Sequence, residues 1–261
     1  MSVDACAALV ERGDPERFAA LMAAPVAARP VLIALGALNL ELARAPWASN
    51  EPMVAEMRLQ WWVDALETAG ASGKPLPHEI GPAVQMALTA GAPLADLVAA
   101  AEARRWDCWK EPFEDEAAFD AYLAATAGGM IWASARALGA DPAAEPIARE
   151  AGWAFGLANL FLAIPELEAR GRYPVVDGRA SALADLALRG LARLDSARAG
   201  RAGLSKANRK ALDPALLQGW QARAILTRAK NEPDRIAAGA LELSEFRRRS
   251  GLLRAALLGA Y

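Results

Sequence analysis

Pairs of acidic residues four positions apart are the feature of this sequence that most directly suggests chemistry. That spacing places two carboxylates on one face of a helix. Paired carboxylates provide oxygen ligands, which Mg²⁺ prefers. The pairs are Asp107/Glu111, Glu111/Asp115, Glu116/Asp120 and Asp141/Glu145. We expect them at helix ends and in connections, where carboxylates oppose the positive end of a helix dipole, so none of them predicts a metal site.

Other reactive groups are scarce. Cys6, Cys108 and the single histidine, His78, are too few to form a structural zinc site. We interpret both cysteines as reduced thiols of a cytosolic protein. His78 lies in a Pro-rich loop, so serine and cysteine nucleophiles have no histidine partner and hydrolase chemistry is not expected.

The composition indicates an all-α protein. Hydrophobic residues make up 54% of the 261 positions, alanine dominates them, and alternating runs of β-branched residues are hard to find. The 29 basic residues nearly balance the 31 acidic ones, so no overall field attracts nucleic acid and we expect no such partner.

The apolar segments favour a cytoplasmic location, at most peripheral to the inner membrane. The N-terminal residues carry acids early and lack a basic segment followed by an apolar run, so they do not predict a signal peptide. The most apolar stretch, residues 31–42, is shorter than the roughly 20 residues that span a bilayer, and it contains Asn39 and Glu41.

Capping and breaking residues divide the chain into helices within one domain, residues 1–261. Asp14 precedes Pro15, Asn50 precedes Pro52, and Gly70 is predicted to end the second of these helices. In that helix Val54, Met57, Trp61 and Ala65 form an apolar stripe beside Trp62, and both tryptophans are predicted core anchors. Further helices are predicted across 83–109, from about 117, from 141 with a buried centre at 151–162, near 180–200, across 213–230, and from 244 to the C-terminus.

Four segments in order resemble the squalene/phytoene synthase family. Residues 58–67 (RLQWWVDALE) look like its arginine and double-aromatic helix, and residues 122–130 (YLAATAGGM) look like its tyrosine and glycine segment. Residues 156–173 (GLANLFLAIPELEARGRY) are similar to its asparagine and Arg-Gly-Arg segment. Residues 215–228, with the later SEFRRRSGLLRAAL, look like the C-terminal half of bacterial members. The resemblance implies an isoprenoid-synthase-like helical bundle around a central cavity.

The chain departs from the family pattern at both acidic motifs. The first pair of family aspartates falls on Ala43 and Arg44, with Trp47 or Ala48 at the third position. The second motif falls on Ala163 and Leu167, after Asn159. The resemblance therefore implies a non-catalytic protein with no metal site, no catalytic residue and no cofactor.

The resemblance also implies a ligand site in the old active-site cavity. The candidate contacts to an isoprenoid, a lipid or a diphosphate are Asn39, Arg58, Trp62, Tyr122, Asn159, Arg170 and Arg172. The aspartate-poor branch of the family includes a mitochondrial assembly factor for respiratory complex I, so a complex I subunit is an expected partner by resemblance alone.

Two alternatives stay open. The chain could be an active head-to-head prenyl transferase of the phytoene or squalene synthase type, with Mg²⁺ held by Glu41, Glu166 or Glu168 instead of the missing aspartates. It could also be a peripheral membrane lipid-binding module, because residues 247–249 are all arginine and lie beside leucines near the C-terminus. A docked C-terminal helix with a solvated basic edge would have the same sequence pattern.

Overall fold

The computed structural model of the chain describes residues 3–259, and over this range it contains helices and no strand. The prediction of an all-α fold is confirmed. The α-helices are α1 (Val3–Gly13), α2 (Pro15–Ala23), α3 (Arg29–Arg44), α4 (Pro52–Ser72), α5 (Gly81–Thr89), α6 (Leu94–Ala103), α7 (Glu116–Leu123), α8 (Gly129–Ala137), α9 (Glu145–Ala169), α10 (Ala180–Gly203), α11 (Lys206–Leu216), α12 (Ala222–Asn231), α13 (Asp234–Ala237) and α14 (Glu245–Leu258).

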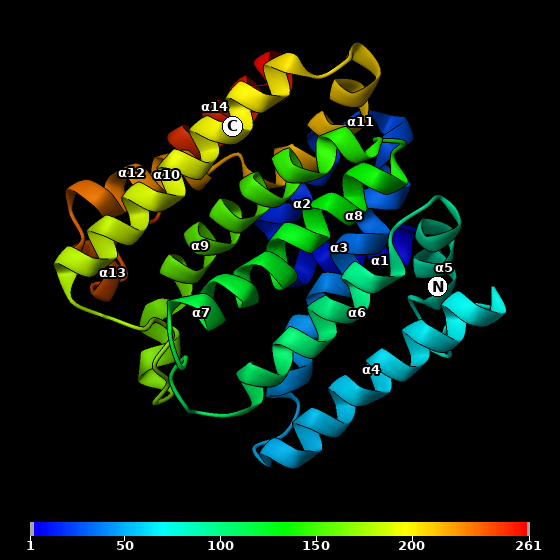
Figure 1. The fold of residues 1–261 in the computed structure, drawn as a ribbon, viewed down its shortest axis with the longest axis horizontal. Coiled ribbons are helices and arrows are strands. Elements are labelled where there is room, and N and C mark those ends of the chain that lie inside the picture. The colour runs from blue at the N-terminus through cyan, green and yellow to red at the C-terminus, as the bar shows by residue number, and fades with distance from the viewer. Residues whose placement is uncertain (1–2, 260–261) are drawn as a thin grey trace.

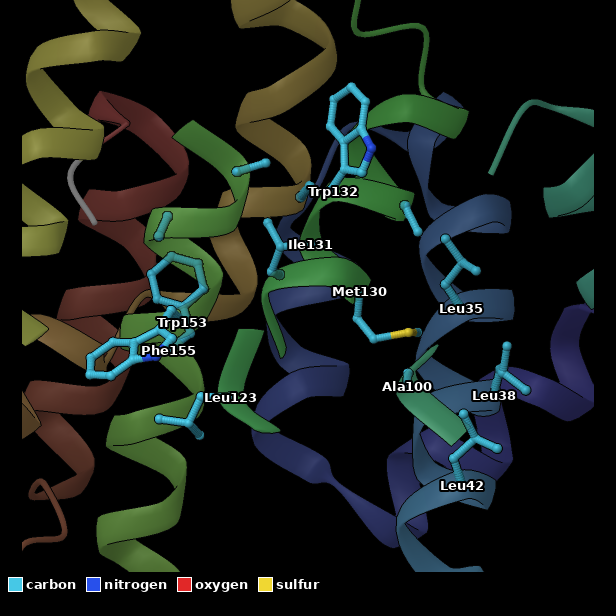
Figure 2. Close-up of a cluster of buried hydrophobic side chains, with 14 of the residues drawn as sticks. Leu35, Leu38, Leu42, Ala100, Leu123, Met130, Ile131, Trp132, Trp153 and Phe155 are labelled. Atoms are coloured by element: carbon cyan, nitrogen blue, oxygen red, sulfur yellow. The ribbon is translucent and has the colours of Figure 1, made fainter. Parts of the chain in front are cut away.

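Helices α3, α8 and α9 form the middle of the bundle, between α4 on one edge and α10 on the opposite edge (Figure 1). α9 is the predicted central helix, and it packs against α8, α10 and α12. Trp153, Phe155 and Phe161 of this helix are all at most 4% exposed. Figure 2 shows the core between these helices, with Met130 lying between α8 and the helices α3 and α6.

Among the residues that the structure describes, two segments are long and apolar enough to cross a membrane by length and composition alone. They are Val26–Trp47, which includes α3, and Pro142–Ala169, which includes α9. More than half of each apolar window is buried inside the protein, at 56% and 61%. That burial is what core helices of a bundle require, because their apolar faces are covered by other helices.

Glycines let α9 approach the segment that connects α7 and α8. This connection, η4 (Ala124–Gly128), is a single π-helical turn. A Cβ atom added at Gly152 would lie 2.7 Å from the Cα of Gly128, closer than real Cβ atoms come to other atoms. At Gly128 and Gly152 the close approach is therefore backbone against backbone.

Three predicted features of α4 are wrong. Asn50 does not cap it, because Glu51 is the N-cap residue and makes no side-chain cap bond. The helix continues through Gly70 to Ser72 and ends at Gly73, whose φ of 67° is the left-handed conformation that favours glycine. Its buried face is also different from the predicted stripe, since Val54 and Met57 are 52% and 70% exposed.

Trp62 and Trp61 have opposite environments. Trp62 is a core anchor at 2% exposure, as predicted, but Trp61 is 38% exposed. Adjacent residues on a helix point about 100° apart, and the buried face of α4 includes Trp62 and Val63 but not Trp61.

The C-terminal third contains more breaks than predicted. The helix predicted across 213–230 is two helices, α11 and α12, joined by the short turn Leu217–Gly219. The last helix ends at Leu258, followed by Gly259 at a φ of 62°, and residues 260–261 lie outside the described range.

Candidate functional site

A cavity of about 280 Å³ lies between α3, α7, α8 and α9, and we call it the central cavity. α3 contributes Asn39 and Ala43 to its wall, and α9 contributes Asn159, Ala163 and Leu167. A second cavity of about 340 Å³ adjoins it, because both are lined by Asn39 and Asn159. Three predicted contacts, Asn39, Tyr122 and Asn159, are therefore brought together in one cavity.

The positions where the family has acidic residues face this cavity without carboxylates. Ala43 and Trp47 line it from the first motif, and Ala163 and Leu167 line it from the second. Arg44 does not line it; its side chain is 48% exposed and lies 3.9 Å from Glu41. Within residues 3–259 no cluster of three or more His, Cys, Asp or Glu side chains could hold a metal ion.

The substitute metal ligands do not converge on the cavity either. Glu41 lines a separate hollow beside His78, with 4.0 Å between Glu41 Oε2 and His78 Nε2. Glu166 is exposed and pairs with Arg170, and Glu168 lines a third hollow.

One carboxylate does line the central cavity, and the sequence analysis did not identify it as a site residue. Asp107 lies in the turn η3 (Arg104–Cys108) and is 6% exposed. Both of its oxygens accept the Tyr122 hydroxyl at 3.0 Å, and Arg104 Nη1 donates to Asp107 Oδ2 at 3.1 Å. The carboxylate is thus held by neighbouring side chains. In the sequence, the signal for this ion pair was the spacing of Arg104 and Asp107, which is about one helical turn.

A second cationic group lines the cavity from α2. Arg17 donates from Nε to Asp14 Oδ2 at 2.8 Å and from Nη1 to Gln218 Oε1 at 2.9 Å. Both Arg17 and Gln218 line the central cavity, together with Arg104. Arg17 was not a predicted contact, and Gln218 is 201 positions away in the chain, so the sequence contained no local signal for their meeting.

The asparagines differ from these groups because they have no protein partner. The side-chain amides of Asn39 and Asn159 make no hydrogen bond with other residues of the described range, although each carries a donor and an acceptor. Polar groups in a cavity wall are normally satisfied by protein, water or ligand. Two facing helices therefore present free amide groups to the cavity.

Arg170 and Arg172 lie against Trp47 at the edge of the cavity. Their guanidinium carbons are 4.6 Å and 4.5 Å from the centroid of the Trp47 ring. Arg172 is 8% exposed and donates to the backbone carbonyls of Asp107 and Trp109. Arg172 thus ties the segment after α9 to the turn η3 through two backbone carbonyls.

Arg58 and Trp62 lie apart from the other predicted contacts. They line a separate hollow with Glu41, Trp61 and His78. Arg58 is exposed on α4, and Trp62 packs against Trp61 and His78 at ring distances of 5.0 Å and 4.8 Å. Neither residue lines the central cavity, so the structure does not bring these two together with Asn39, Tyr122 and Asn159.

The family model described as squalene/phytoene synthase matches residues 10–175. The chain belongs to the squalene/phytoene synthase family. The matched segment contains every residue that lines the central cavity except Gln218. No curated protein matches the chain at a significant level.

Solved structures of this family share the fold. A crystal structure of the squalene synthase HpnC from Alicyclobacillus acidocaldarius matches with a TM-score of 0.72 and 17% identity, over 88% of this chain and 93% of that one. A dehydrosqualene synthase in complex with a ligand matches with a TM-score of 0.71 and 15% identity, over 99% and 97%. The predicted family and its isoprenoid-synthase-like bundle are confirmed.

Proposed function

We propose that this family member binds an anionic isoprenoid or lipid in the central cavity without metal ions and does not catalyse prenyl transfer. The observation that carries the proposal is the set of four cavity-facing positions, Ala43, Trp47, Ala163 and Leu167, none of which has a carboxylate.

The loss of turnover follows from the charge that the reaction develops. Ionising an allylic diphosphate leaves a multiply charged anion, which metal ions neutralise in the transition state. The cavity's single carboxylate, Asp107, is occupied by Arg104 and Tyr122. One occupied carboxylate does not provide the oxygen ligands that Mg²⁺ demands.

Binding a ligand requires fewer protein groups than catalysing its reaction. The guanidinium groups of Arg17 and Arg104 line the cavity, and arginine binds phosphate and carboxylate groups directly. The free amides of Asn39 and Asn159 add further donors. An apolar part of the same wall, formed by Leu123, Met130, Ile131, Phe155 and Leu160, suits a hydrocarbon chain.

Calorimetric titration of the purified protein tests the proposal. We expect farnesyl diphosphate to bind equally well in EDTA and in Mg²⁺, and incubation with Mg²⁺ to yield no condensation product above a no-enzyme control. Any such product would establish the rival function, an active head-to-head prenyl transferase. Failure of farnesyl diphosphate, geranylgeranyl diphosphate and farnesol to bind at all would refute the proposed ligand class.

A matched pair of variants locates the binding site. Arg17→Gln removes a cavity guanidinium, whereas Arg12→Gln removes the same charge from an exposed position of α1 that lines neither of the two adjoining cavities. Hydrogen bonds to a charged group contribute about 1.5–3 kcal/mol, so we expect Arg17→Gln to weaken binding at least tenfold and Arg12→Gln to leave it unchanged. Equal affinities for the two variants would place the ligand elsewhere.

A part in respiratory complex I assembly rests on the resemblance to the aspartate-poor branch. It stays a prediction, which co-purification of the tagged protein with complex I subunits from its own host would test.

A further inference from the structure

The C-terminal helix α14 is covered on one side only. Within Glu245–Leu258, all of which the structure describes, only Ala255 is buried. Large apolar side chains are left outside: Phe246 is 81% exposed, Leu253 60%, Leu257 74% and Leu258 75%. Isolated apolar side chains on a surface are ordinary, but several on one helix face form a patch.

The inner face of α14 holds the helix on the bundle. Arg248 pairs with Glu16 of α2 at 3.1 Å. A Cβ atom added at Gly251 would lie 3.1 Å from the Trp220 ring, so the helix backbone lies close to that indole. Arg248, Gly251 and Ala255 therefore define the side that faces the protein.

The outer face is apolar along its centre. At 3.6 residues per turn, Phe246, Leu253 and Leu257 fall within about 40° of one another, on the side opposite Ala255. Arg249 projects on one flank of this line, and Arg247 and Arg254 project on the other. Helix α14 thus has an inner face that packs on the bundle and an outer apolar face that points away from it.

Positive charge is concentrated on this helix. It carries four arginines and one glutamate, whereas the chain as a whole has a formal charge of −2. Arg249 is 81% exposed even though it pairs with Glu245 at 2.7 Å. Arg247 and Arg254 are exposed and make no ion pair with other residues of the described range.

These observations favour a lipid surface over a protein partner. An apolar line flanked by arginines matches an interfacial helix, whose apolar face enters the headgroup boundary while the guanidinium groups reach the lipid phosphates. A stable dimer interface uses roughly 20–30 residues a side, far more than one helix face supplies. We infer that α14 attaches the protein to an anionic membrane surface, with Phe246, Leu253 and Leu257 in the boundary layer.

Vesicle flotation with the full chain tests this inference. We expect the protein to float with phosphatidylcholine vesicles that contain phosphatidylglycerol, to float less with pure phosphatidylcholine, and to be released by high salt. The variant Phe246→Ser/Leu253→Ser/Leu257→Ser changes only outward side chains and should fold normally by circular dichroism. We expect this variant to stay at the bottom of the gradient.

A matched triple variant controls for lost apolar surface in general. Met53→Ser/Val54→Ser/Met57→Ser removes three exposed apolar side chains of α4, at 70%, 52% and 70% exposure. It should float like the wild type. Replacing Arg247, Arg249 and Arg254 by Gln should lower the partition coefficient about fivefold for each arginine.

Three outcomes would overturn the inference. They are wild-type protein that does not float with anionic vesicles, an α14 variant that floats as well as the wild type, and a concentration-dependent dimer that the α14 variant abolishes. The last result would assign this face to a second copy of the chain. None of these results depends on a ligand in the central cavity, so the proposed function is tested separately.

Discussion

The Tyr122 hydroxyl lies 3.0 Å from each carboxylate oxygen of Asp107, and both residues line the central cavity. Arg104 Nη1 is 3.1 Å from the same hydroxyl and 3.1 Å from Asp107 Oδ2. The three groups thus form a closed network between η3 and α7. Burial raises the pKa of Tyr122 against the opposing charge of Arg104, and the charge of Asp107 adds to the increase, so the hydroxyl keeps its proton and donates it to the carboxylate.

We expect Tyr122→Phe to lower the free energy of unfolding by about 1–3 kcal/mol, because a buried carboxylate loses its donor. Urea denaturation followed by circular dichroism measures the change. Tyr173→Phe is the control, since that side chain is 65% exposed. A loss for Tyr122→Phe no larger than that of the control would show that water or Arg104 fully replaces the hydroxyl.

The adjacent tryptophans of α4 give a test of the observed helix orientation. Trp62→Ala should cost about 3–5 kcal/mol of stability, because it empties a fully packed site. Trp61→Ala should cost less, about 1–2 kcal/mol, because that side chain is 38% exposed. Thermal and urea unfolding of both variants measures the difference, and similar losses would mean that α4 packs on the predicted stripe instead.

The contact between Gly152 and Gly128 is tested by adding one methyl group. Gly152→Ala should destabilise the protein by about 1–3 kcal/mol, because the Cβ meets backbone that has no room to move. Gly203→Ala is the control at the end of α10, where an added Cβ meets nothing within 4 Å. It should be neutral or slightly stabilising, since alanine favours helix by up to about 1 kcal/mol. A neutral Gly152→Ala would contradict the close approach of α9 to η4.

Cys108 makes stability depend on pH in the alkaline range. Burial, aided by the charges of Asp107 and Glu56, raises the pKa of its thiol from 9.0 to about 11. Between these values the unfolded thiol ionises while the folded thiol keeps its proton, so the unfolded state binds fewer protons and stability falls as pH rises. The contribution of the protonated Cys108 thiol to the free energy of unfolding is fully present below pH 9.

The measurement is the stability difference between the wild type and Cys108→Ala by urea unfolding at several pH values. We expect this difference to stay constant up to about pH 9 and to move against the wild type towards pH 11. A difference that does not change with pH would show that the thiol ionises equally easily in both states.

Features that depend on neighbours in the chain were predictable. Asp14 caps α2 as expected, with its Oδ1 accepting the Arg17 backbone N–H at 3.0 Å. The central helix was predicted because residues 151–162 are apolar almost all round, and such a helix has no face that tolerates water. The family motifs also placed Asn39, Tyr122 and Asn159 on segments that meet in one cavity.

Features that depend on the direction a helix faces were not predictable. The stripe of Val54, Met57 and Trp61 has the same spacing as the buried line of Leu59, Trp62 and Leu66. Periodicity alone does not tell which of two apolar faces packs against the bundle. The family resemblance placed Arg58 among the predicted contacts, but it lies on the exposed side of α4.

The sequence by itself determined the fold class, the family and the absence of acids at Ala43, Ala163 and Leu167, because these are properties of residue type and spacing along one chain. Only the tertiary structure decided that Asp107 is held by Tyr122, that Arg17 lines the cavity with Gln218, and that α14 turns an apolar face outward. The physical reason is that packing chooses one face of each helix, and that choice brings together or separates residues whatever their distance in the sequence.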